Sequence, residues 1–334
     1  MKKFIITLSL LLCVFSLSAQ YRPDILGEGF EQLTINQEDA YDGEVVATLV
    51  RHTPLENVNR AVLYVHGYND YFFQREMAEQ FITQGWQFYA VDLRRYGRSM
   101  REWQTPFEVR KMSEYFADID AALDIMEAEG MEEIILMAHS TGGLTTPLYC
   151  HENRENLRVD GLILNSPFFD MNLGGGWYEN LGVPAVSTLG ALFRKMVMSA
   201  GSDSVGGYAR SISNRYDGEW EMDPQLKFEA SQPITAGWIR AIHKAQKQLQ
   251  RGLSIPCPVL VLYSDKSVWG AYSVEEYQAA DSVLDVADIA LYAPKMGDQV
   301  TQIEIAGGMH DLVLSLPEVR YPLYEIIFDW INNF

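Results

Sequence analysis

The sequence predicts an α/β fold built on a mostly parallel, doubly wound sheet. Short apolar runs alternate with segments of helical periodicity through the first half of the chain, and the alternation returns near the C-terminus. The clearest run is residues 134–137, four apolar residues in a row, as expected of a strand covered by helices on both faces. A serine in a small-residue turn follows this strand, which indicates a functional site at the carboxyl edge of the sheet.

The expected elements follow one another closely. An antiparallel pair at 32–36 and 44–50 precedes the parallel part. Next come strands at 61–65, 87–91, 134–137 and 161–164, with helices at 71–83, 107–129 and 142–150. The last part predicts strands at 258–263 and 300–305 and helices at 286–296 and 319–331.

The middle of the chain breaks this pattern. Residues 168–252 contain glycine clusters and helical stretches such as 239–249, but no convincing strand. The sequence therefore predicts a helical insertion of about 168–252 into one α/β domain that covers residues 20–334.

The first nineteen residues have the pattern of a signal peptide. Lys2 and Lys3 precede an apolar stretch at 4–15, and small residues lead to a cleavage site after Ala19. The apolar stretch is too short to span a bilayer. We therefore expect an exported protein, periplasmic or secreted, without stable membrane insertion.

Charge and cysteine content limit the partners further. The formal net charge of −19 disfavours nucleic acid and anionic lipid surfaces as partners. No cluster of Cys, His and acidic residues has the spacing of metal ligands, so neither a metal nor another cofactor is expected. Cys150 and Cys257 allow either one disulfide or two buried thiols.

The serine turn is Ala138-His139-Ser140-Thr141-Gly142, one residue away from the pattern Gly-x-Ser-x-Gly. That pattern puts a serine on a strained strand-to-helix turn with its Oγ exposed. Small residues are needed on both sides of the serine because neighbouring backbones crowd the turn. Ser140 is therefore the candidate nucleophile.

A serine hydroxyl needs a histidine to take its proton, and the histidine needs a carboxylate to orient it. His310 fits the base, because it lies in a glycine-rich loop a few residues after the last expected strand. Asp265 and Asp281 both fit the acid. Asp281 precedes His310 by 29 residues and Asp265 by 45, and a helix, a strand and a loop between acid and base take roughly thirty. Spacing favours Asp281 and leaves Asp265 as the alternative.

An oxyanion hole needs two backbone donors. The residue after the nucleophile, Thr141, supplies one N–H. A His-Gly turn directly after the strand at 61–65 offers the second, from Tyr68.

These motifs together resemble the α/β-hydrolase superfamily, and within it the monoacylglycerol-lipase, lysophospholipase and serine-aminopeptidase-like branch. His66-Gly67-Tyr68 resembles the oxyanion loop of that branch. The segment from Asp92 to Ser99 resembles its D-x-R-G-x-G-x-S motif, with Arg95 where a glycine is usual. Residues 165–167 resemble the lead into the lid of that branch, and 307–315 its histidine loop. The resemblance covers about residues 45–334, except for the insertion.

The resemblance implies an α/β-hydrolase fold in which the insertion forms a lid over Ser140. Aromatic side chains of the lid then either line an apolar acyl pocket or pack the core of the lid itself; they are Trp177, Tyr178, Trp220, Phe228 and Trp238.

The sequence thus predicts a serine hydrolase that cleaves small carboxylic esters, acylglycerol-like or lysophospholipid-like, without a cofactor. A peptidase of the serine aminopeptidase type is the alternative within the enzyme class, followed by an acyltransferase. A non-catalytic binding protein of the same fold is the alternative outside it.

Overall fold

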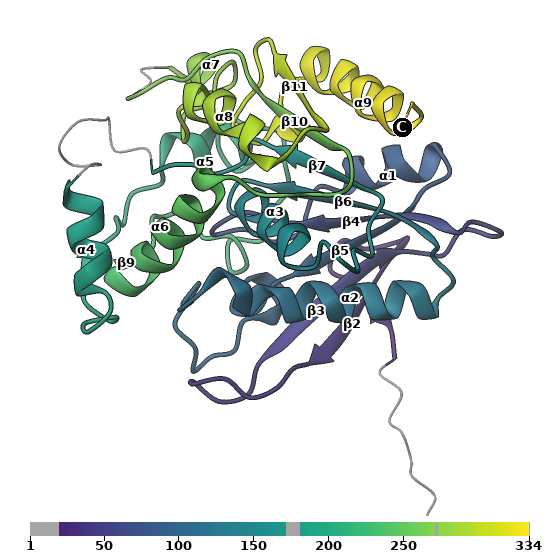
Figure 1. Ribbon diagram of the computed structural model, residues 1–334. Coiled ribbons are helices and arrows are strands. Elements are labelled where there is room, and N and C mark those ends of the chain that lie inside the picture. The colour runs from purple at the N-terminus through teal and green to yellow at the C-terminus, as the bar shows by residue number, and fades with distance from the viewer. Residues whose placement is uncertain (1–19, 172–180, 271–272, 334) are drawn as a thin grey trace, which may run out of the picture.

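The computed structural model describes residues 20–171, 181–270 and 273–333 (Figure 1). Its main feature is a nine-stranded sheet in the order β1-β2-β3-β5-β4-β6-β7-β10-β11. The strands are β1 (Arg22–Pro23), β2 (Phe30–Asn36), β3 (Val46–His52), β4 (Arg60–Val65), β5 (Gln87–Asp92), β6 (Glu133–His139), β7 (Gly161–Asn165), β10 (Val259–Ser264) and β11 (Val300–Ile305). The pairings from β5 to β11 are parallel, whereas β1, β2 and β3 pair antiparallel at one edge. The predicted fold class is confirmed.

Helices cover both faces of the sheet because its central strands are apolar on both sides. In β4, Ala61, Leu63 and Val65 join one core, whereas Val62 and Tyr64 join the other. The helices around the sheet are α1 (Arg75–Thr83), α2 (Phe116–Ala128), α3 (Gly142–Glu152), α8 (Val286–Tyr292) and α9 (Pro317–Ile331). Helices α1 and α9 pack on one face, and α2 and α3 on the other (Figure 1).

The chain between β7 and β10 is an insertion at the carboxyl edge of the sheet. Its described elements are α4 (Val183–Leu189), β8 (Val197–Ser199), α5 (Gly207–Ile212), β9 (Ile234–Thr235) and α6 (Ala236–Arg251). The two strands pair with each other, although the sequence predicts no strand here, because strands of two and three residues are too short to show a period. Helices α4 and α6 lie together at the left of Figure 1.

Two predicted helices begin later than the sequence indicates. The helix expected at 71–83 begins at Arg75, because the Phe72 N–H donates to Asp92 Oδ1 (2.9 Å) instead of entering a helix. The helix expected at 107–129 begins at Phe116 after a 3₁₀ turn, η2 (Met112–Tyr115). Phe107 has a φ of 61°, which no right-handed helix accommodates.

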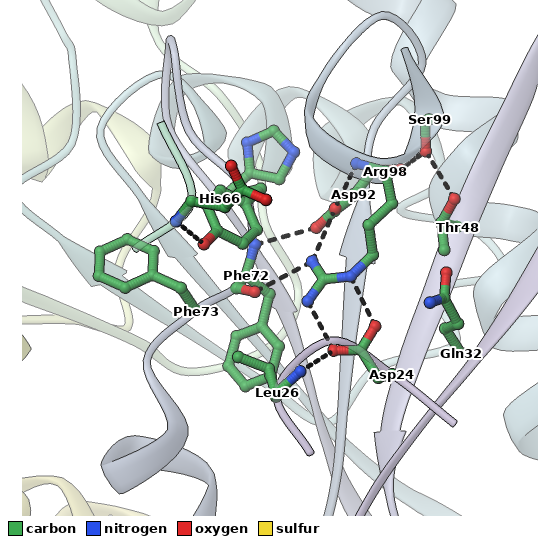
Figure 2. A network of polar contacts seen from close by, with 12 residues as sticks. Asp24, Leu26, Gln32, Thr48, His66, Phe72, Phe73, Asp92, Arg98 and Ser99 are labelled. Carbon is green, nitrogen blue, oxygen red and sulfur yellow. Dashed lines mark hydrogen bonds and ion pairs between the residues drawn. The ribbon is translucent and has the colours of Figure 1, made fainter. Parts of the chain in front are cut away.

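A buried ionic network fixes the segment that follows β4 (Figure 2). The Arg98 guanidinium donates to both oxygens of Asp24 (2.7 and 2.8 Å), to Asp92 Oδ2 (2.9 Å) and to the Phe72 carbonyl (3.0 Å). The Ser99 hydroxyl donates to the Asp92 carbonyl (2.7 Å). The side chains of Asp24 and Asp92 are completely buried, and that of Arg98 is 4% exposed. The end of β5, the N-terminal segment and the loop before α1 are thereby tied to one guanidinium.

Two further findings concern the cysteines and the membrane. Cys150 and Cys257 are both buried free thiols. Among the helices that the structure describes, none is long and apolar enough to span a membrane.

The Arg98 network gives a stability prediction. Replacing a buried, paired guanidinium leaves two carboxylates without their partner, so Arg98→Met should lower the free energy of unfolding by about 3–5 kcal/mol. The matched control is Arg158→Met, because Arg158 pairs with Asp124 and Glu127 at the surface and should contribute at most about 1 kcal/mol. Urea denaturation of both variants measures the difference, and equal losses would contradict it.

Candidate active site

Ser140 lies in the turn between β6 and α3. Its φ of 52° is in the left-handed region, which costs a non-glycine residue on the order of 1–3 kcal/mol. The Ser140 N–H donates to the Asn165 carbonyl (3.1 Å), and the Phe168 N–H donates to the Ser140 carbonyl (3.0 Å). A Cβ on Gly142 would lie 2.5 Å from the His66 carbonyl oxygen. The turn therefore needs a glycine after it, and hydrogen bonds hold it in the strained conformation.

The structure brings Ser140, His310 and Asp281 together. His310 Nε2 lies 3.1 Å from Ser140 Oγ, and His310 Nδ1 lies 2.9 Å from Asp281 Oδ2. Asp281 Oδ1 also accepts from the N–H groups of Val283 (2.8 Å) and Leu284 (2.7 Å). With Nδ1 donating to the carboxylate, Nε2 keeps its lone pair toward the serine hydroxyl. The relative exposure is 7% for Ser140, 4% for His310 and 0% for Asp281.

The alternative acid, Asp265, lies elsewhere. Its Oδ1 accepts from the Gly307 N–H (2.9 Å), so it holds the beginning of the histidine loop rather than the imidazole. Asp265 is also exposed, whereas Asp281 is buried. Residues 265–280 include the short helix α7 (Val274–Tyr277), and the chain then returns to the sheet edge, where Ser267 and Asp281 form a parallel bridge.

Buried amides hold the other side of the histidine loop. The carboxylate of Asp311 accepts from Asn165 Nδ2 (2.6 Å) and from Gln74 Nε2 (3.0 Å). The ring of His139 lies 4.7 Å from that of His310, and burial lowers the pKa of His139, so this neighbour is neutral. A neutral neighbour does not oppose a positive charge on His310.

Two backbone N–H groups border the serine. Neither the Tyr68 N–H nor the Thr141 N–H donates to an acceptor among the described residues. The loop that carries Tyr68 approaches the serine closely, since a Cβ on Gly67 would lie 3.0 Å from Ser140 Cβ. Thr141 precedes the first turn of α3, where the helix dipole also favours negative charge.

The aromatic residues named from the insertion separate into groups. Trp238 is buried with its ring 4.9 Å from that of Tyr68, and Phe228 packs 5.9 Å from Phe107. Trp220 packs against the core on the face of the sheet that α1 and α9 cover, and its Nε1 donates to the Leu314 carbonyl (2.9 Å). Trp177 and Tyr178 lie outside the described residues.

Sequence reasoning missed several residues of the site. The ring of Tyr208, on α5, packs 5.7 Å from that of His310, and burial raises the pKa of its hydroxyl, which stays protonated. Asp70, in the loop after β4, is buried and pairs with Lys227 of the insertion. The position of Asp70 three residues after Gly67 is a weak turn signal. No sequence pattern points to Tyr208 or Lys227.

Within the described ranges, no group of three or more His, Cys, Asp or Glu side chains could hold a metal ion.

Comparison with known proteins gives a family match. Residues 56–314 match the model of the family described as "Serine aminopeptidase, S33". No curated protein matches the sequence.

Several solved structures share the fold. A soluble variant of monoglyceride lipase from Saccharomyces cerevisiae, in complex with a substrate analog, has a TM-score of 0.63 at 14% identity, over 90% of this chain and 94% of that one. Monoacylglycerol lipase from Paleococcus ferrophilus has a TM-score of 0.56 at 19% identity, over 82% and 95%. Est1E from Butyrivibrio proteoclasticus, with ferulic acid bound, has a TM-score of 0.53 at 15% identity, over 86% and 97%.

The site geometry predicts how the serine reacts with a fluorophosphonate probe. Wild type should be labelled at Ser140, and Asp281→Asn should slow labelling by roughly 10⁴, because an uncharged partner no longer stabilises the imidazolium. Asp265→Asn is the matched control and should change the rate only slightly. The measurement is the labelling rate by intact mass. A larger loss in the Asp265 variant than in the Asp281 variant would reverse the assignment of the acid.

Proposed function

The chain belongs to the serine aminopeptidase (S33) family and is a serine hydrolase of the α/β-hydrolase fold, and we propose that it cleaves carboxylic esters through an acyl-enzyme. The observation that carries this proposal is the position of His310 between two partners, 3.1 Å from Ser140 Oγ and 2.9 Å from Asp281 Oδ2. In this arrangement His310 can take the proton of the serine hydroxyl, and Asp281 can stabilise the imidazolium that results.

In the proposed reaction, Ser140 Oγ attacks the acyl carbonyl while His310 Nε2 takes its proton. The N–H groups of Tyr68 and Thr141 donate to the oxyanion of the tetrahedral intermediate. The intermediate collapses when His310 protonates the leaving alcohol. A water molecule, deprotonated by His310, then attacks the acyl group and releases the carboxylic acid and the free serine. Asp281 stays ionised and holds the imidazole in one orientation throughout.

The surroundings of the site support an acyl chain as the substrate group, in an acylglycerol-like or lysophospholipid-like ester. Aromatic rings pack on the Tyr68 side chain, with Phe107 at 4.7 Å and Trp238 at 4.9 Å from the Tyr68 ring. The insertion also exposes large apolar side chains, among them Leu192 at 81% and Phe193 at 58%. The structural neighbours include proteins described as monoglyceride lipases.

A peptidase remains the second candidate because of the description of the family. An aminopeptidase needs a carboxylate to bind the α-ammonium group of its substrate. Two buried carboxylates beside the site already have partners, because Lys227 pairs with Asp70 and the amides of Gln74 and Asn165 donate to Asp311. This occupancy favours esters over N-terminal peptides.

The ester proposal predicts a clear order of substrates. Wild type should hydrolyse p-nitrophenyl esters and monoacylglycerols faster than aminoacyl anilides. Ser140→Ala should lower kcat by about 10⁴ or more, because the nucleophile is lost. Ser204→Ala, which alters an exposed serine of the insertion, is the control and should keep wild-type rates. Anilide turnover above ester turnover would favour the peptidase, and turnover of neither class would refute both.

The pattern of residues 1–19 supports a further proposal, that the protein is exported and cleaved after Ala19. Expressed with its own leader in a bacterium, the protein recovered from the periplasm or medium should begin at Gln20. Intact mass and N-terminal sequencing measure this. Recovery of the whole chain from the cytoplasm alone would contradict the proposal.

A further inference from the structure

A segment of the insertion, residues 223–228, binds directly to the loop at residues 66–73. The Asn69 side chain donates to the Phe228 carbonyl (2.7 Å) and accepts from the Phe228 N–H (2.9 Å). The Asp223 N–H donates to the Tyr71 hydroxyl oxygen (2.8 Å). These hydrogen bonds join parts of the chain that lie more than 150 residues apart in the sequence. They attach the insertion directly to the 66–73 loop.

An ion pair with little exposure to solvent lies in the same contact. Lys227 Nζ lies 2.7 Å from Asp70 Oδ1, and the two side chains are 12% and 2% exposed. The other oxygen of Asp70 accepts from the Gly67 N–H (3.4 Å). Gly67 directly precedes Tyr68, whose N–H is one of the two proposed oxyanion donors. The ammonium thus acts on the Gly67 N–H through the carboxylate, and the Tyr68 N–H belongs to the next peptide along the chain.

The carboxylate is charged because of its partner. Burial by itself would raise the pKa of Asp70, but the Lys227 ammonium, with a smaller contribution from His66, brings it below its usual value. Asn69 and Gly67 restrict the same turn from both sides, since Asn69 has a φ of 49° and Gly67 lies against Ser140. A turn under these constraints should change its peptide orientation if the charge that anchors it is removed.

We propose that Lys227 is a positioning residue for the oxyanion hole, and that residues 223–228 are a fixed support of the 66–73 loop. This inference rests on the proposed ester hydrolysis. Lys227 does not touch the substrate. It holds the Asp70 carboxylate, which accepts from the Gly67 N–H and so orients the His66–Gly67 peptide. The next peptide carries the Tyr68 N–H, and its carbonyl oxygen, that of Gly67, lies 2.8 Å from His66 Nδ1.

A support of this kind acts on the transition state more than on the bound substrate. The oxyanion forms only as the carbonyl becomes tetrahedral, so a misdirected N–H lowers kcat and leaves KM nearly unchanged. Loss of a whole oxyanion donor costs about 10²–10³ in kcat. A donor that is displaced but present should cost less, about 10- to 100-fold.

The first test compares two lysine- or arginine-to-methionine variants of the insertion. Lys227→Met should lower kcat for a p-nitrophenyl ester by about 10- to 100-fold, per active site titrated with fluorophosphonate, with KM within about threefold of wild type. Arg215→Met removes the Arg215–Glu229 ion pair of the same insertion, in which no residue of the 66–73 loop takes part, and should leave both constants unchanged. A loss confined to KM, or to the number of titratable sites, would overturn the inference.

A transition-state analogue separates positioning from general damage. An alkylboronic acid forms a tetrahedral adduct with a serine, and its inhibition constant should rise in Lys227→Met by the same factor as kcat/KM falls. The inhibition constant of the matching aliphatic alcohol, which lacks the oxyanion, should not change. Equal changes for both inhibitors would overturn the inference.

A double variant that removes both charges provides a second test if Lys227→Met folds poorly. Asp70→Asn combined with Lys227→Met removes both charges but keeps an amide oxygen that can accept from the Gly67 N–H. The double variant should recover most of the kcat lost in the single variant, and Lys227→Arg should retain most of it as well. A double variant as slow as Lys227→Met would overturn the role of Asp70. Absence of Ser140-dependent turnover in wild type would refute the proposed function itself, which is a separate outcome.

Discussion

The ends of β6 and β7 lie close together at the carboxyl edge of the sheet, and the position of the catalytic serine depends on this close packing. Two adjacent strands, β6 and β7, are each followed directly by a serine with left-handed backbone, Ser140 with a φ of 52° and Ser166 with a φ of 46°. Behind them a Cβ on Gly143 would lie 2.7 Å from the Pro167 side chain. The start of α3 is thus packed tightly against the segments that follow β4 and β7, so the nucleophile is positioned by the sheet.

Arg95 shows how a strained position can be used to bind another part of the chain. Its φ of 66° is one that glycine adopts freely, and the related motif has a glycine there. The side chain is nevertheless completely buried, pairs with Asp42 and lies near Glu114. Its guanidinium also stacks over the ring of Tyr41, 4.7 Å from the centroid. The ion pair between Arg95 and Asp42, which lies in the turn before β3, thus offsets the backbone strain at Arg95.

The parts that the sequence predicts well are those with local causes. Strand β11 lies where it was expected, and the other parallel strands lie within two residues, because buried strands have continuous apolar runs. The first residues expected in α1 are irregular because the distant carboxylate of Asp92 binds Phe72. The spacing argument pointed to the aspartate that contacts His310. Lys227 could not be found in this way, since its partner is 157 residues away and no periodicity connects them.

The insertion contacts the site on two sides that belong to different halves of the chain. Asn69, which precedes Ser140 in the sequence, hydrogen-bonds to the insertion. Two residues that follow Ser140 also contact it: the Leu314 carbonyl accepts from Trp220, and the His310 ring packs against Tyr208. An exchange of this segment for that of a relative would therefore also replace the side chains that contact the 66–73 loop and His310. Residues 69 and 70 and the loop around 314 would have to be transplanted with it. A change in this insertion would therefore alter the contacts of the 66–73 loop and of His310 as well as the exposed apolar surface of the insertion.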